Sequence, residues 1–277
     1  MIRWFSTRAA LARHLAVIGP MAKAAQELAY AHRGQTGWCA ACRRIAAFKL
    51  LGPTDEWTSL RECLVCTCGM NGRSRMLINV FEDEPPTGRF LMFERVTPFF
   101  GVVQQRYPFV EGCEFFGADV PSGETRRLGD IDVRHENMLG LSFDDASIDY
   151  LFHGDVLEHL PDIDRALAEC RRVLKPGGTM LFTCPVVNVD RHNVRCRVVD
   201  GRLQHVLPPA YHGNPMDASG SLVFTEPSWQ MLDDLARAGF ASVEVGLLLD
   251  PFQGILRDGN PYDDYNMWPV FFRARKS

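Results

Sequence analysis

The stretch from Asp144 to Pro185, DDASIDYLFHGDVLEHLPDIDRALAECRRVLKPGGTMLFTCP, decides the expected fold. Residues 147–153 form a short apolar run that ends at Gly154, as in a strand buried on both faces of a parallel sheet. Apolar residues then recur at three- and four-residue steps over 163–174, which predicts a helix, and 179–183 predicts the next strand. This β-α-β order favours a parallel sheet with helices on both faces.

Polar and turn-forming residues mark both ends of the predicted helix. Asp162 and Asp164 favour its start, while the cation, proline and glycines of KPGG (175–178) favour a stop and a tight turn. The order of these signals, with DVLEHLPD (155–162) between strand and helix, resembles the central motifs of class I S-adenosylmethionine (SAM) dependent methyltransferases of the type 11 group. The resemblance implies an α/β, Rossmann-like, doubly wound and mostly parallel sheet.

The composition is that of a globular protein with an uneven charge distribution. Its 277 residues suffice for one α/β domain and a smaller part, and no run approaches the roughly 20 apolar residues of a membrane span. Residues 1–50 hold eight Lys or Arg and one acidic residue, although the formal net charge is -4. Charges spread in this way favour a solvated basic helix. The odd number of cysteines, nine, favours a reducing compartment, so we expect a cytoplasmic protein.

Five cysteines in the first third of the chain predict a zinc-ribbon-like segment. Cys39 and Cys42 form one pair, and Cys63, Cys66 and Cys68 follow after twenty residues. Two pairs of thiolates at this separation suit a tetrahedral structural zinc ion, which needs four ligands of the five. The choice among the last three stays open, and a set of buried free thiols is the alternative.

These signals divide the chain into three parts. We expect a helical segment over 1–36 and a zinc-ribbon-like segment with a connecting helix over 37–82. After a linker with two prolines, the methyltransferase-like domain is expected over 88–277, with an insertion at 186–224. Such an insertion would cover the active-site edge of the sheet and select the acceptor.

The resemblance also assigns cofactor-binding positions to the carboxyl ends of the expected strands. Phe93 and Glu94 follow the first strand, although the Gly-rich loop common in this family is missing there. Asp119 would end the second strand and accept hydrogen bonds from the ribose hydroxyls. Asn137 takes the place of the usual adenine-binding Asp, and Met138 follows it.

The motif after the fourth expected strand allows two interpretations. The resemblance places His153 and Asp155 beside the cofactor sulfonium and the acceptor. In addition, Asp155, Glu158 and His159 are spaced at i, i+3 and i+4, so one face of a helical turn would carry ligands for a second divalent metal. Ubiquinone-pathway O-methyltransferases and small-RNA 2'-O-methyltransferases resemble this stretch and use an E-x-x-E-H face for a metal. Helix capping is the alternative.

The leading hypothesis for function is a SAM-dependent methyltransferase. It would act on an oxygen or nitrogen of a small-molecule, glycan or secondary-metabolite acceptor, with His153, His205 or His212 as the candidate base. The missing Gly-rich loop favours one alternative, a degenerate methyltransferase-like binding or scaffold protein. The zinc ribbon and the basic first segment favour another, a nucleic-acid-modifying enzyme, but we do not expect a nucleic-acid partner.

Overall fold

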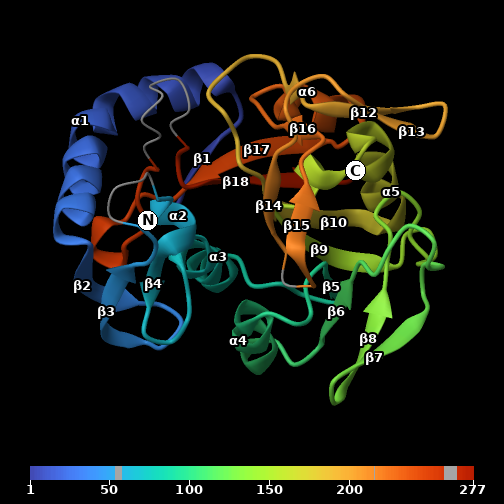
Figure 1. Ribbon diagram of the computed structural model, residues 1–277, viewed down its shortest axis with the longest axis horizontal. Coiled ribbons are helices and arrows are strands. Elements are labelled where there is room, and N and C mark those ends of the chain that lie inside the picture. Colours follow the sequence, from blue (N-terminus) through green and yellow to red (C-terminus); the bar gives the residue numbers. More distant parts are fainter. Residues whose placement is uncertain (54–57, 215, 259–266) are drawn as a thin grey trace. The chain divides into compact units, whose positions relative to one another are not determined.

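The structure is a computed structural model that describes residues 1–53, 58–214, 216–258 and 267–277 (Figure 1). The chain divides into two compact units, each made of two segments. The first comprises Met1–Pro86 and Glu244–Phe271, and the second comprises Thr87–Val243 and Phe272–Ser277. The division near residue 87 lies beside the boundary expected at residue 88, but residues 244–271 join the first unit.

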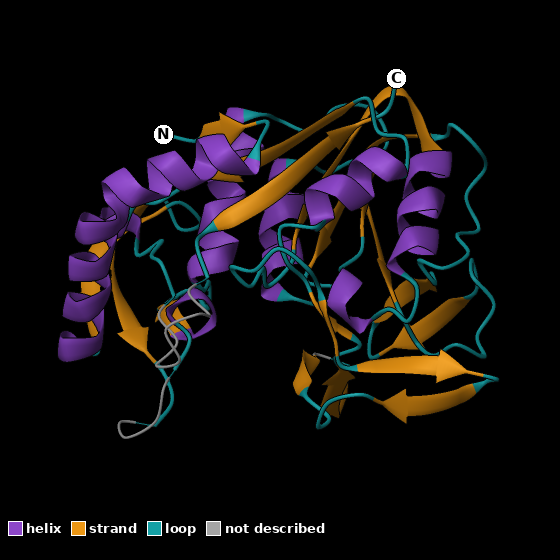
Figure 2. Cartoon of the chain, turned by 90° about the horizontal axis from the view of Figure 1, so that it is seen from above, coloured by secondary structure: helices purple, strands orange, loops and turns teal. Residues whose placement is uncertain are grey.

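The first unit contains a long helix, α1 (Arg8–His32). The Thr7 hydroxyl accepts a hydrogen bond from Ala10 N at 3.2 Å and so caps its start. Pro20 lies inside the helix and lacks a backbone N–H, which accounts for the bend that both views show (Figures 1 and 2). The shorter elements are β1 (Arg3–Phe5), β2 (Gly34–Cys39), β3 (Arg44–Leu50), α2 (Leu60–Cys63), β4 (Leu64–Cys66), α3 (Gly72–Asp83) and η2 (Pro251–Gln253).

A small antiparallel sheet, in the order β2-β3-β4, brings the cysteines of the first unit together. Cys39 pairs with Arg44 at the turn between β2 and β3, while Cys66 pairs with Phe48 farther along β3. Because β4 runs in the same direction as β2, the chain that follows Cys66 approaches the β2–β3 turn. Phe48 and Leu64 are buried in the core behind it.

The second unit is built on a sheet whose strands follow the order β18-β10-β9-β5-β6-β8-β7. The neighbours from β10 to β8 are parallel, and the outer pairs β10–β18 and β7–β8 are antiparallel. This arrangement confirms the predicted doubly wound, mostly parallel α/β sheet. Its strands are β5 (Phe90–Met92), β6 (Val110–Glu114), β7 (Thr125–Leu128), β8 (Ile131–His135), β9 (Ile148–Gly154), β10 (Leu174–Thr183) and β18 (Val270–Arg275).

Helices connect these strands, and one further strand crosses between the units. The helices are α4 (Pro98–Arg106), η1 (Leu157–His159), α5 (Ile163–Val173) and α6 (Met231–Arg237). The strand β17 (Ser242–Leu247) starts in the second unit, continues into the first and pairs antiparallel with β1 there.

The β9-α5-β10 unit follows the sequence signals closely. Asp162 caps α5 by accepting a hydrogen bond from Arg165 N at 2.9 Å. The fully buried residues of α5 are Ala166, Leu167, Cys170 and Val173. Burial of a side chain such as Leu167 contributes about 1.5–3 kcal/mol. At 175–178 the β9–β10 pairing shifts, and a Cβ on Gly178 would lie 2.8 Å from Lys175 O, so this turn needs glycine.

The strand order reverses between β5 and β9. Phe90 of β5 pairs with Val110 of β6 on one side and with Tyr150 of β9 on the other. Since all three strands are parallel, their carboxyl ends meet at one edge of the sheet. Open α/β sheets bind ligands at such a reversal point.

The expected insertion at 186–224 folds into short antiparallel strands. Hairpin β12–β13 is largely exposed and projects from the rest of the unit in both views (Figures 1 and 2). His192 anchors the start of the segment, because its Nε2 lies 2.7 Å from Asp234 Oδ2 and its Nδ1 accepts from Ser228 N at 2.9 Å. The strands are β11 (Asn193–Val194), β12 (Cys196–Val199), β13 (Arg202–His205), β14 (Tyr211–Asn214), β15 (Asp217–Leu222) and β16 (Thr225–Glu226).

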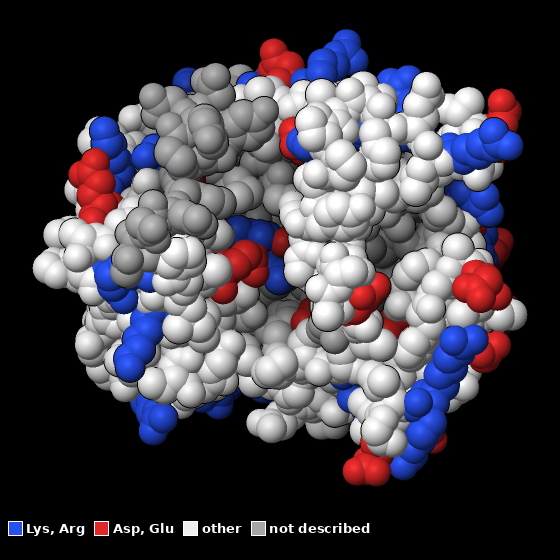
Figure 3. All heavy atoms as spheres, in the orientation of Figure 1, with Lys and Arg blue, Asp and Glu red and all other residues white. Residues whose placement is uncertain are grey.

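The charged side chains on the surface are mixed in sign. On the face drawn in Figure 3, Lys and Arg side chains lie among Asp and Glu side chains. In the basic first segment, Lys23 lies 3.8 Å from Glu27 and Arg43 lies 3.2 Å from Glu82. Among the described residues, no helix combines the length and apolar character needed to cross a membrane.

Candidate functional site

A carboxylate lies at the edge of the sheet where the strand order reverses. β6 ends at Glu114, whose Oε1 accepts hydrogen bonds from Arg95 N at 2.8 Å and Val96 N at 3.0 Å. Burial raises the pKa of Glu114, and the two amides act in the opposite direction. The end of β6 is therefore joined to the loop that follows β5.

That loop packs directly over β6. A Cβ on Gly112 would come within 2.8 Å of Glu94 O and 2.5 Å of the Phe100 ring, so glycine is needed for the approach. The Thr97 hydroxyl donates to Glu94 and accepts from Phe100 N at 3.1 Å, which caps α4. The backbone N–H of Phe93 donates to β9 at 2.9 Å. Phe93 and Glu94 thus lie at the predicted edge, in a loop fixed by its own hydrogen bonds.

The structure corrects the position of the second strand's terminal acid. We expected the strand to end at Asp119, but β6 ends five residues earlier, at Glu114. Asp119 is exposed in a turn in which Val120 N donates to Gly117 O at 3.3 Å. The sequence signal for Glu114 was the short pattern VEGCE, in which an acid directly follows a buried cysteine.

Asn137 and Met138 lie in the loop that follows β8. Glu136 N donates to Glu114 O at 3.0 Å, which places this loop next to the end of β6. Asn137 Oδ1 accepts from Leu139 N at 3.0 Å, so its acceptor already takes part in a local turn, and Met138 is 3 % exposed. The predicted adenine-binding pair is near the edge, but the Asn137 oxygen stabilises the loop itself.

His153 belongs to the core and not to the ligand-binding edge. Its side chain is fully buried, and its ring stacks on Phe182 with centroids 4.6 Å apart. Neither ring nitrogen has a hydrogen-bond partner among the described residues. Burial lowers the pKa of His153 to about 3, although Asp155 acts to raise it. The structure thus places the side chain of His153 in the core and not at the carboxyl edge, where its catalytic and cofactor-binding roles are predicted.

Asp155 is held by β10 and not by the motif that follows it. Its φ of 54° is unusual for a residue other than glycine, and its Oδ1 accepts from the Thr183 hydroxyl at 2.8 Å. Asp155 therefore does not join Glu158 and His159 in the predicted set of metal ligands. Potential ligand atoms of Glu158, His159 and His212 lie within 4.8 Å of one another instead.

The insertion brings only one of its two predicted catalytic histidines to this group. His212 is in β14, and its Nδ1 lies 3.6 Å from Glu158 Oε1. His205 is exposed in β13, where it pairs with Cys196 at the base of the projecting hairpin. The predicted role of a base at this edge is therefore open to His212 and not to His205.

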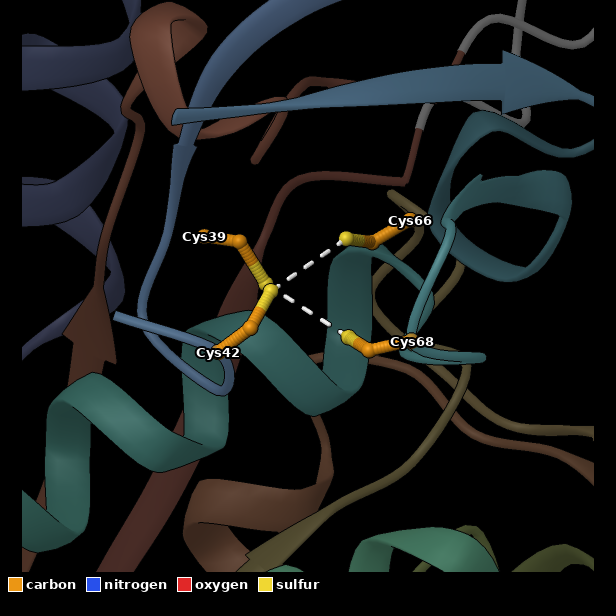
Figure 4. Close-up of side chains that lie close together, drawn as sticks. All are labelled: Cys39, Cys42, Cys66 and Cys68. Atoms are coloured by element: carbon orange, nitrogen blue, oxygen red, sulfur yellow. Dashed lines mark hydrogen bonds between the residues drawn. The ribbon is translucent and has the colours of Figure 1, made fainter. Parts of the chain in front are cut away.

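Four of the five predicted metal-binding cysteines converge in the first unit (Figure 4). The Sγ atoms of Cys39 and Cys68 are 3.7 Å apart, and those of Cys42 and Cys66 are 3.6 Å apart. A tetrahedral zinc ion with Zn–S bonds of about 2.3 Å would separate its sulfurs by about 3.8 Å. Cys63 ends α2, outside this group, and burial raises the pKa of its thiol.

Arg75 of α3 supports the chain segments around the cysteine cluster. Its side chain is fully buried, and its guanidinium lies 4.1 Å from the centre of the Phe48 ring. It donates hydrogen bonds to Leu64 O at 3.1 Å and Met70 O at 2.6 Å, on either side of the turn that carries two of the cysteines. It also donates to both carbonyl oxygens of residues 253–254. One side chain thus links β4, the turn after it and the returning segment.

Comparison with known proteins places a family match over the centre of the second unit. Residues 110–182, from β6 to β10, match the methyltransferase domain family. The methyltransferase domain match thus contains Glu114, Asp155 and the η1 residues Glu158 and His159.

Individual relatives are similar over shorter stretches. A probable SAM-dependent methyltransferase of Mycolicibacterium smegmatis is 44 % identical over 55 residues, which are 20 % of this chain and 21 % of that protein. A demethylmenaquinone methyltransferase of Staphylococcus epidermidis is 41 % identical over 63 residues, 23 % and 26 % of the two chains. The chain thus spans about a quarter or less of the length of these relatives.

Solved methyltransferase structures are similar over more of the chain at lower identity. A SAM-dependent methyltransferase of Mesorhizobium loti is 17 % identical with a TM-score of 0.44, covering 73 % of this chain and 98 % of the other. A phosphoethanolamine N-methyltransferase of Haemonchus contortus in complex with SAM is 14 % identical with a TM-score of 0.40, covering 73 % and 52 %.

Proposed function

We propose that this protein is a SAM-dependent methyltransferase that acts on an oxygen or nitrogen of a small-molecule acceptor. The observation that carries the proposal is the carboxylate of Glu114 at the end of β6, next to the reversal point of a doubly wound sheet and within the stretch that matches the methyltransferase domain family. When bound, SAM supplies a methyl group that is already activated, so the chain needs to bind and orient its two ligands.

The residues at this edge fit SAM in several respects. Glu114 would accept hydrogen bonds from the ribose hydroxyls, the role that we first assigned to Asp119. The loop with Asn137 and Met138 would border the adenine, and Phe93 and Glu94 would border the methionine part. Asp155 would lie beside them at the end of β9.

The acceptor would bind under the insertion at 186–224. Hairpin β14–β15 carries His212 to η1, next to the end of β9, so a methyl acceptor there would meet side chains of the insertion. We infer that these hairpins select the acceptor, which we place among small molecules, glycan and secondary-metabolite building blocks included. The relatives named as demethylmenaquinone and phosphoethanolamine methyltransferases favour a small molecule in general.

We also infer that Cys39, Cys42, Cys66 and Cys68 hold a structural zinc ion. The sulfur separations support this inference, and four thiolate ligands leave no open coordination position for catalysis. Burial raises the pKa of Cys39 and Cys68, so these thiols would release protons when the ion binds. A cytoplasmic location, which keeps thiols reduced, remains a prediction.

The proposed function is tested by calorimetric titration of the intact protein with SAM. Glu114→Gln keeps the shape of the side chain but removes its charge, and we expect SAM affinity to fall by about 10- to 100-fold, as for a lost hydrogen bond to a charged group. Asp119→Asn is the matched control in an exposed turn, and it should bind SAM like the wild type. Thermal melting of both variants checks that the fold is retained.

The same titration can reject the proposal. A folded wild-type protein that gives no heat with SAM would instead support a methyltransferase-like scaffold. The engagement of the Arg95 and Val96 amides by Glu114 favours this second candidate, because amides that are already bonded are not available to a ligand. If Asp119→Asn lost SAM affinity and Glu114→Gln did not, Asp119 and not Glu114 would be the residue that binds the ribose hydroxyls.

A further inference from the structure

We propose that Glu158, His159 and His212 form a binding site for a divalent transition-metal cation, separate from the cysteine cluster. One potential ligand atom of each residue lies within 4.8 Å of the other two. Two imidazoles and one carboxylate suit ions such as Zn²⁺, Fe²⁺ or Co²⁺, whereas Mg²⁺ prefers oxygen ligands. The site does not depend on the proposed methyl transfer.

The carboxylate of Glu158 is close to two imidazoles but makes no hydrogen bond to the described residues. Its side chain is fully buried in η1, and neither carboxylate oxygen has a hydrogen-bond partner among the described residues. Burial of an ionised carboxylate without compensation costs several kcal/mol. A cation next to this carboxylate would remove that cost.

Both imidazoles approach the same oxygen of this carboxylate. His159 Nε2 lies 3.7 Å and His212 Nδ1 lies 3.6 Å from Glu158 Oε1. Both distances exceed the range of about 2.7–3.2 Å for N–H···O hydrogen bonds. Ligand atoms on an ion with bonds of about 2.1 Å lie roughly 3.0–3.4 Å apart, so small inward movements would complete the coordination.

The orientation of His159 is already that of a metal ligand. Its Nδ1 lies 2.9 Å from Leu222 O. A carbonyl oxygen only accepts hydrogen bonds, so Nδ1 carries a proton, and in the neutral ring the lone pair is then on Nε2, on the side of Glu158. Metal-binding histidines typically donate their second ring N–H to a carbonyl or a carboxylate in this way.

One hairpin supplies both a ligand and this orienting carbonyl. β14–β15 pairs His212 with Ser221 and includes Leu222, and Phe224 N then donates to Glu158 O at 2.8 Å. The ion would therefore fasten the hairpin to η1. The His212 side chain is 43 % exposed, so solvent reaches the group, and three protein ligands leave further coordination positions open.

The test uses the full-length protein with zinc already bound at the cysteine cluster, titrated with Co²⁺. Visible absorption reports cobalt on imidazole and carboxylate ligands, while thiolate-to-cobalt charge-transfer bands would reveal exchange at the cysteines. We expect one additional Co²⁺ per chain to bind the wild type and to raise its melting temperature. Absence of a second bound ion would overturn the proposal.

Variants locate the bound ion. His212→Ala removes a partly exposed ligand and should weaken Co²⁺ binding by at least about tenfold, and Glu158→Gln should do the same. His205→Ala removes an exposed histidine of the same insertion and should bind like the wild type. Equal Co²⁺ affinity in His212→Ala and the wild type would refute the site, even if Glu158→Gln failed to fold. SAM titration of the same samples tests the methyltransferase proposal separately.

Discussion

Replacement of Cys66 by serine is expected to remove the zinc ion of the cysteine cluster and to destabilise the first unit strongly. The variant should hold about one equivalent of zinc less than the wild type, because a tetrahedral structural site needs all four ligands. Structural zinc binding contributes apparent free energies of about 10–16 kcal/mol in zinc-finger peptides. Elemental analysis and thermal unfolding measure the two effects.

The core of the first unit explains why the ion matters there. The small sheet β2-β3-β4 packs on a limited set of apolar residues, which include Phe48, Leu60 and Leu64. Two of the cysteines, Cys39 and Cys66, belong to the same cluster. Loss of the ion would remove four metal bonds that involve two buried cysteines, Cys39 and Cys66, so it would affect the packing of the core as well as the two turns.

Cys63→Ser is the matched control for this prediction. This variant makes the same replacement of Sγ by a hydroxyl oxygen, three residues before Cys66, but Cys63 lies outside the four-cysteine cluster. We expect a full equivalent of zinc and nearly unchanged thermal unfolding. If Cys63→Ser lost its zinc while Cys66→Ser kept it, the two ligands from this segment would be Cys63 and Cys68.

The elements that sequence reasoning predicted well are those with local signals. Gly154 ends β9 nearly where expected, and Asp162 caps α5 as predicted. The apolar spacing of α5 describes its buried face, since a helix of 3.6 residues per turn repeats within the segment itself. The predicted order of strands and helices then indicated a doubly wound sheet.

The site residues were harder to predict because their neighbours come from distant segments. His212 reaches Glu158 only through the pairing of β14 with β15, and 53 residues separate the two positions. The spacing of Asp155 and Glu158 had suggested a shared face, but the Thr183 hydroxyl holds Asp155 at the end of β10. The spacing of residues within one helical turn does not predict the contact of His212 with Glu158 or that of Thr183 with Asp155.

The remaining errors concern which side chains lie at the carboxyl ends of the strands. The sequence predicts Asp119 as the acid that ends the second strand, whereas β6 ends five residues earlier, at Glu114. His153 lies within both the predicted strand and β9, but its side chain is buried in the core and does not reach the carboxyl edge. Such differences do not change the fold, yet each changes which side chain lies at the carboxyl edge.

Replacement of His153 by leucine is expected to make the protein more resistant to acid than the wild type. The folded pKa of His153 is about 3, below the ordinary value of 6.5, because burial disfavours the charged ring. The unfolded chain therefore binds a proton in this interval that the folded chain does not. The contribution of His153 to stability is constant above pH 6.5 and is lost progressively as the pH falls from 6.5 towards 3.

The magnitude follows from the size of this shift. Between pH 7.5 and pH 4.5, the free energy of unfolding of the wild type should fall by about 2–3 kcal/mol more than that of His153→Leu. At pH 7.5 the variant should be at least as stable, since it removes two buried nitrogens that have no partner among the described residues. Denaturant titrations at the two pH values give both quantities.

His205→Leu distinguishes burial from the mere loss of a histidine. His205 is exposed in β13, so its replacement removes a histidine without a change to the core. We expect the unfolding free energy of this variant to change with pH as the wild type does. Protonation of a ring that stacks on Phe182 without access to water must lower the free energy of unfolding of the wild type. The same pH dependence of unfolding in His153→Leu and the wild type would therefore contradict the buried position of His153.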